Sequence, residues 1–286
     1  MDLNQLKNLI LSSLAEDIGR GDVTSKAVIP QGKMVKAKII AKQKGIIAGL
    51  PFAVLVFKAV DKKVKVQVKV KDGKRFSKGK VIATITGPAR SILTAERTAL
   101  NFLQRMSGIA TLTAEYVKKV RGLNVKILDT RKTAPGLRLL DKYAVKVGGG
   151  TNHRMGLYDA VLIKENHIAV AGSIKKAISL ARKNAPALMM IEVEAQSLRD
   201  VAEAIDAGAH NILLDNMGIK TLKKAVEMVK KYNKGAGVPQ AVIKTEASGG
   251  VNLDNVRKIA QTGVDAISVG ALTHSPKALD ISLEIM

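Results

Sequence analysis

The sequence predicts an α/β protein in which an N-terminal α/β sandwich-like domain is followed by an incomplete parallel α/β barrel. Apolar and polar residues alternate as in strands before about Gly87, whereas short apolar strands alternate with amphipathic helices from Val125 onward. The first pattern is typical of an antiparallel sheet with one solvated face, and the second of parallel strands joined by helical crossovers. We expect the first domain over residues 1–112 and the barrel over residues 113–275, with a last helix over residues 276–286 that returns to the first domain.

The N-terminal domain is expected to begin with a helix and to continue as a sheet. Apolar residues between Leu3 and Leu14 have the spacing of an amphipathic helix. The strand-like alternation runs through Val35, Ala37, Ile39 and Ala41, and again through Val64, Val66, Val68 and Val70. The segment DGKRFSKGKVIATI is typical of a β-meander. Residues 90–122 then indicate a helix with an interruption near Ser107 and Gly108.

The barrel is expected to contain six clear strands: VKILD, AVLI, LMMIEVE, NILLD, AVIKTE and AISVG. They end near Asp129, Lys164, Glu194, Asp215, Glu246 and Gly270, at intervals of 21 to 35 residues. Even with a weak seventh strand around residues 144–147, the set is smaller than the eight strands of a full barrel. The active site of such a barrel lies at the carboxyl ends of the strands, where a charged residue or glycine follows each strand here.

Composition excludes several classes of protein. The longest nearly apolar run, from Ile46 to Phe57, has twelve residues, which is too short to span a bilayer, so we expect no membrane partner. The chain has no cysteine for disulfides or thiolate metal sites, and we expect a cytoplasmic location. The net charge of +23 could indicate nucleic-acid binding, but aromatic residues make up only 3% and the lysines are dispersed. We therefore expect no nucleic-acid partner.

Five basic residues gather in short segments beside the expected strand ends. Arg131 and Lys132 are adjacent, as are His153 and Arg154, and Lys164 follows another strand. Arginine offers a planar fork that matches carboxylates and phosphates, whereas lysine acts as a mobile point charge. Any one of these residues could lie on a solvated basic face. Together, between glycines and apolar strands, they predict a pocket for a substrate with several anionic groups.

Glu194 and Asp215 are the acidic candidates at strand ends. They could cap helices or form ion pairs, or they could bind ribose hydroxyls and Mg²⁺, a hard ion that prefers carboxylate and substrate oxygens. Glu192 lies on the same face of its strand as Glu194, because side chains alternate with a period of two.

Glycine-rich turns follow the last two expected strands, each ahead of a helix. They are Ser248, Gly249 and Gly250 in one turn and Gly270 and Ala271 in the other. Glycine lets backbone N–H groups approach a phosphate, and barrel enzymes often bind phosphate at these two loops. Plain turns are the alternative, but two such loops in succession favour a 5′-phosphate site.

The segments DTRKTAPGLR, GGGTNHRMGL and LIKENH resemble signature segments of quinolinate phosphoribosyltransferase, also called nicotinate-nucleotide pyrophosphorylase (carboxylating), a type II phosphoribosyltransferase family. The resemblance continues through EDIGRGDVTS, ERTALNFLQRMSGIATLT, IEVEAQS, ILLDNM, EASGGV and SVGALTHS. These segments cover nearly the whole chain in the order found in the family.

The resemblance implies that quinolinate and phosphoribosyl pyrophosphate are converted to nicotinate mononucleotide, pyrophosphate and CO₂, with Mg²⁺ as the cofactor. It assigns the quinolinate carboxylates to Arg131, His153, Arg154 and Lys164, and substrate binding also to Thr130. It assigns the pyrophosphate side to Lys132 and Lys164, and the ribose and Mg²⁺ to Glu194 and Asp215. Lys132, Lys164, Glu194 and Asp215 would then be the catalytic residues.

The resemblance also implies a homodimer with shared active sites, in which Arg97 reaches the quinolinate site of the neighbouring subunit. A hexamer is a further assembly compatible with it. Alternatives remain at this point: a related enzyme that takes nicotinate, a paralogue associated with molybdenum transport, a phosphate-binding isomerase on a barrel, and a non-catalytic basic protein that binds RNA. A nicotinate enzyme needs to neutralise one carboxylate, whereas the basic residues here suit two.

Overall fold

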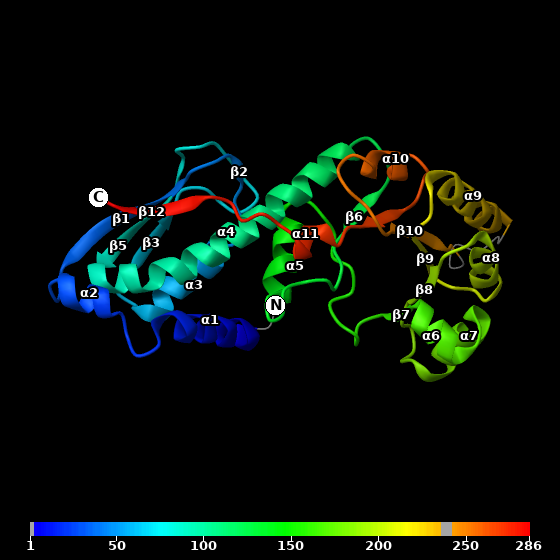
Figure 1. Cartoon of the computed structure of the whole chain (residues 1–286), viewed down its shortest axis with the longest axis horizontal. Helices are drawn as coiled ribbons and strands as arrows, with labels where there is room; N and C mark the ends of the chain where they lie inside the picture. The colour runs from blue at the N-terminus through cyan, green and yellow to red at the C-terminus, as the bar shows by residue number, and fades with distance from the viewer. Residues whose placement is uncertain (1–2, 236–241) are drawn as a thin grey trace. The chain divides into compact units, whose positions relative to one another are not determined.

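The computed structural model describes residues 3–235 and 242–286, and the chain divides into two compact units (Figure 1). The first unit contains Met1–Ala114, Thr133–Gly149 and Thr273–Met286, and the second contains Glu115–Lys132 and Gly150–Leu272. The expected division near residue 112 is close to the first of these boundaries. Residues 133–149, which we expected in the barrel domain, group with the first unit instead.

The main sheet of the first unit is antiparallel, as the alternation predicted. Its described strands lie in the order β12 (Ile281–Ile285), β1 (Met34–Ala41), β5 (Val81–Pro88) and β3 (Lys65–Val68). In β1, the apolar Ala37 and Ile39 are buried, whereas Lys36 is exposed. Val68, on the edge strand β3, is exposed. A short second pair joins β2 (Gly45–Ile46) to β4 (Arg75–Phe76).

The helices that precede the parallel strands are α1 (Leu3–Ile18), α2 (Val23–Val28), α3 (Leu50–Val60) and α4 (Ala89–Lys119). As predicted, α1 is amphipathic, and it buries Leu6, Ile10 and Leu14. The expected interruption near Ser107 is wrong, because α4 is continuous there. The Ser107 hydroxyl accepts the Ala48 N–H at 3.1 Å, and a Cβ at Gly108 would collide with the Lys277 carbonyl. The small residues serve close packing and do not break the helix.

The carboxyl end of the chain is a strand, so the predicted helix over residues 276–286 is wrong. β12 pairs antiparallel with β1, with Ile281 opposite Ala41 and Ile285 opposite Ala37. A helix would have left the N–H and C=O groups along this side of β1 without strand partners. The pairing places this end of the chain in the first unit.

Residues 133–149 contain the helix α5 (Arg138–Val147), so the weak strand expected at residues 144–147 is also wrong. The α5 residue Asp141 is fully buried and accepts two hydrogen bonds of 2.8 Å from Arg105 on α4. Tyr143 donates its hydroxyl to Asp72 at 2.9 Å. These buried polar contacts explain why the segment belongs to the first unit.

The second unit is built on a parallel sheet, as predicted. Its described strands are β6 (Lys126–Leu128), β7 (Val161–Ile163), β8 (Ile191–Ala195), β9 (Asn211–Asp215), β10 (Lys244–Ser248) and β11 (Ala266–Ser268). Their order is β6-β11-β10-β9-β8-β7, and every pairing is parallel. The first strand therefore pairs with the last, and the others follow in chain order. This is the winding of a barrel that stays open between β6 and β7.

Helices connect these strands, which is the crossover expected for parallel neighbours. They are α6 (Glu165–Ala171), α7 (Ile174–Asn184), α8 (Leu198–Asp206), α9 (Ile219–Gly235) and α10 (Val256–Ala260), and α11 (Ala271–His274) follows β11. Two strands differ from their expected bounds. The strand expected from Leu188 begins at Ile191, and the one expected over residues 241–246 runs from Lys244 to Ser248, with Ala241 outside the described residues.

A short irregular segment lies along the open edge of β6. Thr151 forms an isolated parallel bridge with Leu128, and its N–H donates to the Ile127 carbonyl at 2.8 Å. The guanidinium of Arg154 donates to the carbonyl of Ala160, just ahead of β7, at 2.9 Å. Residues 151–154 therefore connect the two free edges of the sheet.

None of the helices in the described part of the chain has the length and apolar character that a membrane span needs.

Candidate active site

The candidate residues of the second unit lie at or just beyond the carboxyl ends of the parallel strands. The strand ends carry Thr130, Lys164, Glu194, Asp215, Ser248 and Gly270. Strand register places the side chains of Glu192 and Asn211 level with each other, and those of Glu194 and Leu213 level with each other. Because side chains alternate with a period of two, Lys164, Glu194 and Asp215 share one face of the sheet. The strands therefore gather the predicted side chains at one edge.

Arg131 and Arg154 lie close enough at this edge for their charges to interact. The pKa of the Arg154 guanidinium is lowered by burial and by the neighbouring charge of Arg131, while Glu192 acts in the opposite direction. Arg154 Nη1 donates to the Ala160 carbonyl, but its Nε is buried and has no hydrogen-bond partner within the described ranges. Two cations this close, with a buried donor left over, favour an anion between them.

Lys132 and Lys164 complete the basic set. The backbone N–H of Lys132 donates to the Thr130 hydroxyl at 3.0 Å, which closes the turn after β6. Lys164 caps the amino end of α6, and its own N–H donates to Nδ1 of His167 at 2.9 Å. Its side chain is exposed and lies near Glu194.

The acidic pair is formed by Glu194 and Asp215, on β8 and β9. Burial raises the pKa of Glu194, the neighbouring Asp215 carboxylate raises it further, and Lys164 opposes both effects. The repulsion that Asp215 exerts on the Glu194 carboxylate would be relieved by a cation between them. Their hard oxygen donors fit Mg²⁺.

The turn after β10 has the conformation expected of a glycine loop. Gly249 and Gly250 have φ angles of +92° and +60°, in the left-handed region that favours glycine. A Cβ at Gly249 would also collide with the side chain of Asn216. The helix expected directly after this turn starts later, at Val256, whereas Gly270 does lead straight into α11. The backbone of the first loop, more than a helix end, is therefore available to a phosphate.

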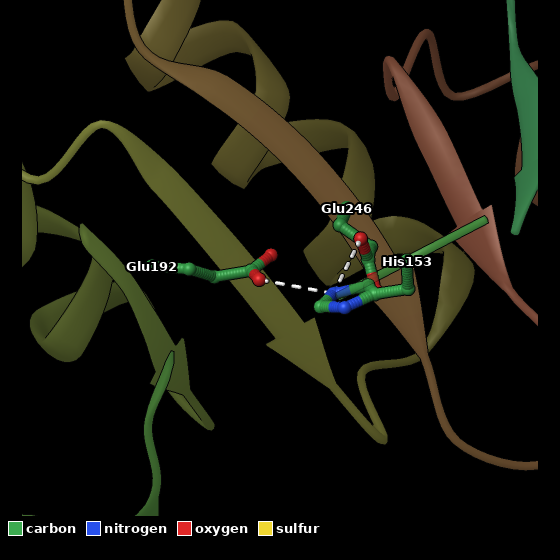
Figure 2. A group of neighbouring side chains, drawn as sticks. All are labelled: His153, Glu192 and Glu246. Carbon is green, nitrogen blue, oxygen red and sulfur yellow. Dashed lines mark ion pairs between the residues drawn. The ribbon is translucent and has the colours of Figure 1, made fainter. Parts of the chain in front are cut away.

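Beneath this edge lies a buried acidic cluster that sequence reasoning did not assign to the site. Figure 2 shows Glu192 from β8 and Glu246 from β10 pointing at the His153 ring. His153 Nε2 lies 3.0 Å from Glu192 and 3.5 Å from Glu246. Asp129, which is fully buried, accepts the backbone N–H of His153 at 2.9 Å. The signal that could have been used in the sequence is a glutamate inside each of two strands, in IEVEA and KTEAS.

His153 and Arg97 differ from the other candidates. Nδ1 of His153 accepts the Arg154 N–H at 2.8 Å and Nε2 faces the two glutamates, so protein groups engage both ring nitrogens. Arg97 is exposed on α4 and belongs to the first unit, whereas the other candidates belong to the second.

Comparison with known proteins gives the family. The model of the quinolinate phosphoribosyl transferase N-terminal domain matches residues 22–107, and that of the C-terminal domain matches residues 109–284. The probable nicotinate-nucleotide pyrophosphorylase (carboxylating) of Bacillus subtilis is 45% identical over 281 residues, covering 98% of this chain and 93% of the relative. A quinolinate phosphoribosyltransferase (decarboxylating) of Nicotiana glauca is 46% identical over 290 residues, covering 98% and 82%.

Solved structures agree over the whole chain. The NadC structure from Streptococcus pyogenes has a TM-score of 0.92 and 39% identity, covering 100% of this chain and 98% of that one. The nicotinate-nucleotide pyrophosphorylase structure from Francisella tularensis has a TM-score of 0.89 at 39% identity, with coverage of 100% and 98%. The chain therefore belongs to the quinolinate phosphoribosyl transferase family.

Proposed function

We propose that the protein transfers the phosphoribosyl group from phosphoribosyl pyrophosphate to quinolinate, with loss of CO₂, to give nicotinate mononucleotide and pyrophosphate. This is a step of NAD biosynthesis, and the relatives named for this reaction support it. Within the structure, the proposal depends most on the closely spaced guanidinium groups of Arg131 and Arg154, at the sheet edge that also carries Glu194 and Asp215.

Quinolinate carries two adjacent carboxylates, and the basic residues fit that charge. Arg131 and Arg154 repel each other until an anion lies between them, and the buried Nε of Arg154 is a donor without a hydrogen-bond partner in the described part of the chain. Lys164 would contact the same substrate from the end of β7. A substrate with one carboxylate would leave part of this positive charge uncompensated.

The ribose and phosphate groups would occupy the rest of the edge. Glu194 and Asp215 would accept hydrogen bonds from ribose hydroxyls, and Lys132 would face the pyrophosphate. The open backbone around Gly249 and Gly250, together with Gly270 and Ala271, would bind the 5′-phosphate.

The chemistry needs positioning and charge more than a covalent nucleophile. The pyridine nitrogen attacks C1 of the ribose as pyrophosphate leaves, and the sugar passes through a cationic state. Glu194 and Asp215 stabilise that cation, while Lys132 and Lys164 stabilise the departing anion. The nitrogen of the product ring is positive, so the ring can accept the electron pair released as the 2-carboxylate leaves as CO₂.

Three further features belong to this proposal. Glu194 and Asp215 are the residues that would hold Mg²⁺, which when bound supplies positive charge to the pyrophosphate. A homodimer would bring Arg97 to the active site of the neighbouring subunit, as the resemblance implies, and could assemble further into a hexamer. A cytoplasmic location is supported by the resemblance to bacterial relatives.

The test is a comparison of two acceptors. The protein is incubated with Mg²⁺, phosphoribosyl pyrophosphate and either quinolinate or nicotinate, and release of CO₂ and formation of mononucleotide are followed. Loss of the second carboxylate should cost about 2–5 kcal/mol, so turnover with nicotinate should be at least about thirty-fold lower. Equal turnover of the two acids would contradict the proposed acceptor.

A further inference from the structure

Glu192, Glu246 and His153 form a buried cluster of ionisable side chains in the second unit. Glu192 and Glu246 are each 5% exposed, and His153 lies between them (Figure 2). One carboxylate oxygen of each glutamate faces the His153 Nε2, at 3.0 Å and 3.5 Å. The other oxygen of each is buried without a hydrogen-bond partner among the described residues. Burying carboxylate oxygens without hydrogen-bond partners costs free energy, which indicates that the cluster has a role other than stabilising the fold.

The hydrogen bonds of His153 determine which ring nitrogen carries the proton. The backbone N–H of Arg154 donates to Nδ1 at 2.8 Å, and a nitrogen that accepts a hydrogen bond carries no proton. The proton of the neutral ring is therefore on Nε2, which donates it to Glu192. A protonated Nε2 cannot bind a metal ion, although the three side chains are close enough to surround one. The geometry thus favours a hydrogen-bonded network over a metal centre.

The group at the other end of this network is Arg154. Residues 151–154 connect the free edges of β6 and β7 through Thr151 at one end and the Arg154 guanidinium at the other. The His153 side chain reaches the interior, where it meets Glu192 of β8 and Glu246 of β10. A second histidine also accepts a backbone N–H at its Nδ1: His167 accepts that of Lys164 at 2.9 Å.

We propose that Glu192 and Glu246 are positioning residues that hold His153 as the neutral Nε2–H tautomer, so that its Nδ1 fixes the backbone of Arg154 at the open edge of the sheet. The proposal rests on the function proposed above only for the role of Arg154 in binding quinolinate. It gives His153 an indirect role, in place of the direct carboxylate contact that the family resemblance implied.

Burial acts strongly on the pKa of Glu246 in this cluster. Burial raises the pKa of Glu246 to about 7, and the neighbouring carboxylate of Glu192 contributes to the rise, while His153 and the Ser268 hydroxyl oppose it. Asp129, which anchors the His153 backbone, is a smaller contributor in the same direction as Glu192. A proton on Glu246 reduces the repulsion between the glutamates. Glu192, at 3.0 Å against 3.5 Å for Glu246, is the nearer acceptor for Nε2–H.

The first test uses ¹⁵N spectroscopy of the whole protein labelled at histidine, with the His153 signals identified from a His153→Asn sample. We expect the Nε2–H tautomer at about pH 8, with no conversion to imidazolium when quinolinate is added. The reverse tautomer, or an imidazolium that forms with quinolinate, would overturn the proposal. So would binding of one equivalent of Zn²⁺ alone that shifts Nε2, because it would make the cluster a cation site.

The second test removes the charge of both glutamates in a Glu192→Gln and Glu246→Gln double variant. An amide can donate to Nε2, so the ring proton can move to Nδ1 and the Arg154 N–H loses its acceptor. Amide hydrogen exchange at Arg154 should become at least roughly ten-fold faster, and the KM for quinolinate should rise roughly ten-fold while kcat changes less than about two-fold. The matched control is Glu227→Gln on the exposed side of α9, which should change none of these.

The outcomes separate the two proposals. Unchanged exchange at Arg154 in a folded double variant would overturn the positioning role. If the double variant does not fold, the tautomer of the wild-type protein decides the matter. If the wild-type protein fails to convert quinolinate, the proposed function fails, whereas the tautomer and the hydrogen exchange still test the arrangement around His153.

Discussion

In the first unit the buried carboxylate of Asp141 meets the guanidinium of Arg105 in a two-pronged ion pair, whereas in the second unit the buried carboxylates of Glu192 and Glu246 meet at one imidazole. The first arrangement satisfies both carboxylate oxygens. The second leaves one oxygen of each glutamate without a hydrogen-bond partner among the described residues. The Asp141–Arg105 pair, with both carboxylate oxygens hydrogen-bonded, is typical of a pair that stabilises the fold. Buried carboxylate oxygens without partners, as at Glu192 and Glu246, are typical of functional sites.

The largest effect is expected from breaking the closed pair. Arg105→Ala would leave the Asp141 carboxylate, which is fully buried, without its two strongest donors. Breaking a buried ion pair by removing one partner costs about 3–5 kcal/mol of unfolding free energy. Chemical denaturation would measure this, with Arg199→Ala on the exposed surface of α8 as the control. A loss no greater than that of the control would show that the pair is not a stability element.

The acidic pair at the sheet edge should show the opposite behaviour. Glu194→Ala and Asp215→Ala should each reduce kcat about 100- to 1000-fold, the effect typical of removing one preorganised charge from a transition state. Both residues are only half-buried, so the unfolding free energy should change little. Steady-state kinetics and a denaturation curve on the same samples would test this. Strong destabilisation with normal kcat would show that Glu194 and Asp215 stabilise the fold, as Arg105 and Asp141 do, and do not act in turnover.

The buried cluster predicts how stability depends on pH. The pKa of Glu246 is raised to about 7 in the folded protein from an unfolded value of 4.5, so the folded state holds a proton that the unfolded state has lost between these values. Stability that depends on this proton is complete below about pH 4.5 and is lost as the pH rises through about 7. Relative to Glu246→Gln, the wild-type protein should lose on the order of 1–3 kcal/mol across this window. Parallel stability curves for the two proteins would contradict the buried proton.

The smallest signal, a partial recovery of activity, would show whether the first unit contributes to the chemistry. If Arg97 acts in the neighbouring subunit of a dimer, Arg97→Ala and Lys132→Ala should each be nearly inactive alone. Mixed dimers can hold both changes in one site and leave the other site intact. Joint dissociation and reassociation should therefore restore about a quarter of the wild-type activity with random pairing. No recovery despite demonstrated subunit exchange would place Arg97 in the active site of its own subunit or in the core.

Regular patterns made much of the fold predictable. Alternation in the first unit and the strand–helix repeat in the second gave the antiparallel sheet, the parallel sheet and the ends of β6, β7, β8 and β9 to within about one or two residues. These features depend on side-chain periodicity, which is local. The errors fell where distant contacts decide. Within residues 276–286, Ile281–Ile285 form a strand that pairs with the edge of β1. At residue 108 the nearby Lys277 carbonyl leaves no room for a side chain, so this glycine marks close packing and not a helix break.

Residue type and spacing were enough to predict the fold class, the family and the set of charged residues at the strand ends. The arrangement of that set depends on how the strands pair in three dimensions. β10 continues past Glu246 to Ser248, which turns an expected strand-end carboxylate into an interior one that faces His153. The proton position on that ring follows from a backbone N–H at Arg154 and a carboxylate at Glu192. No local pattern records such a meeting, because these groups come together only when the strands pair.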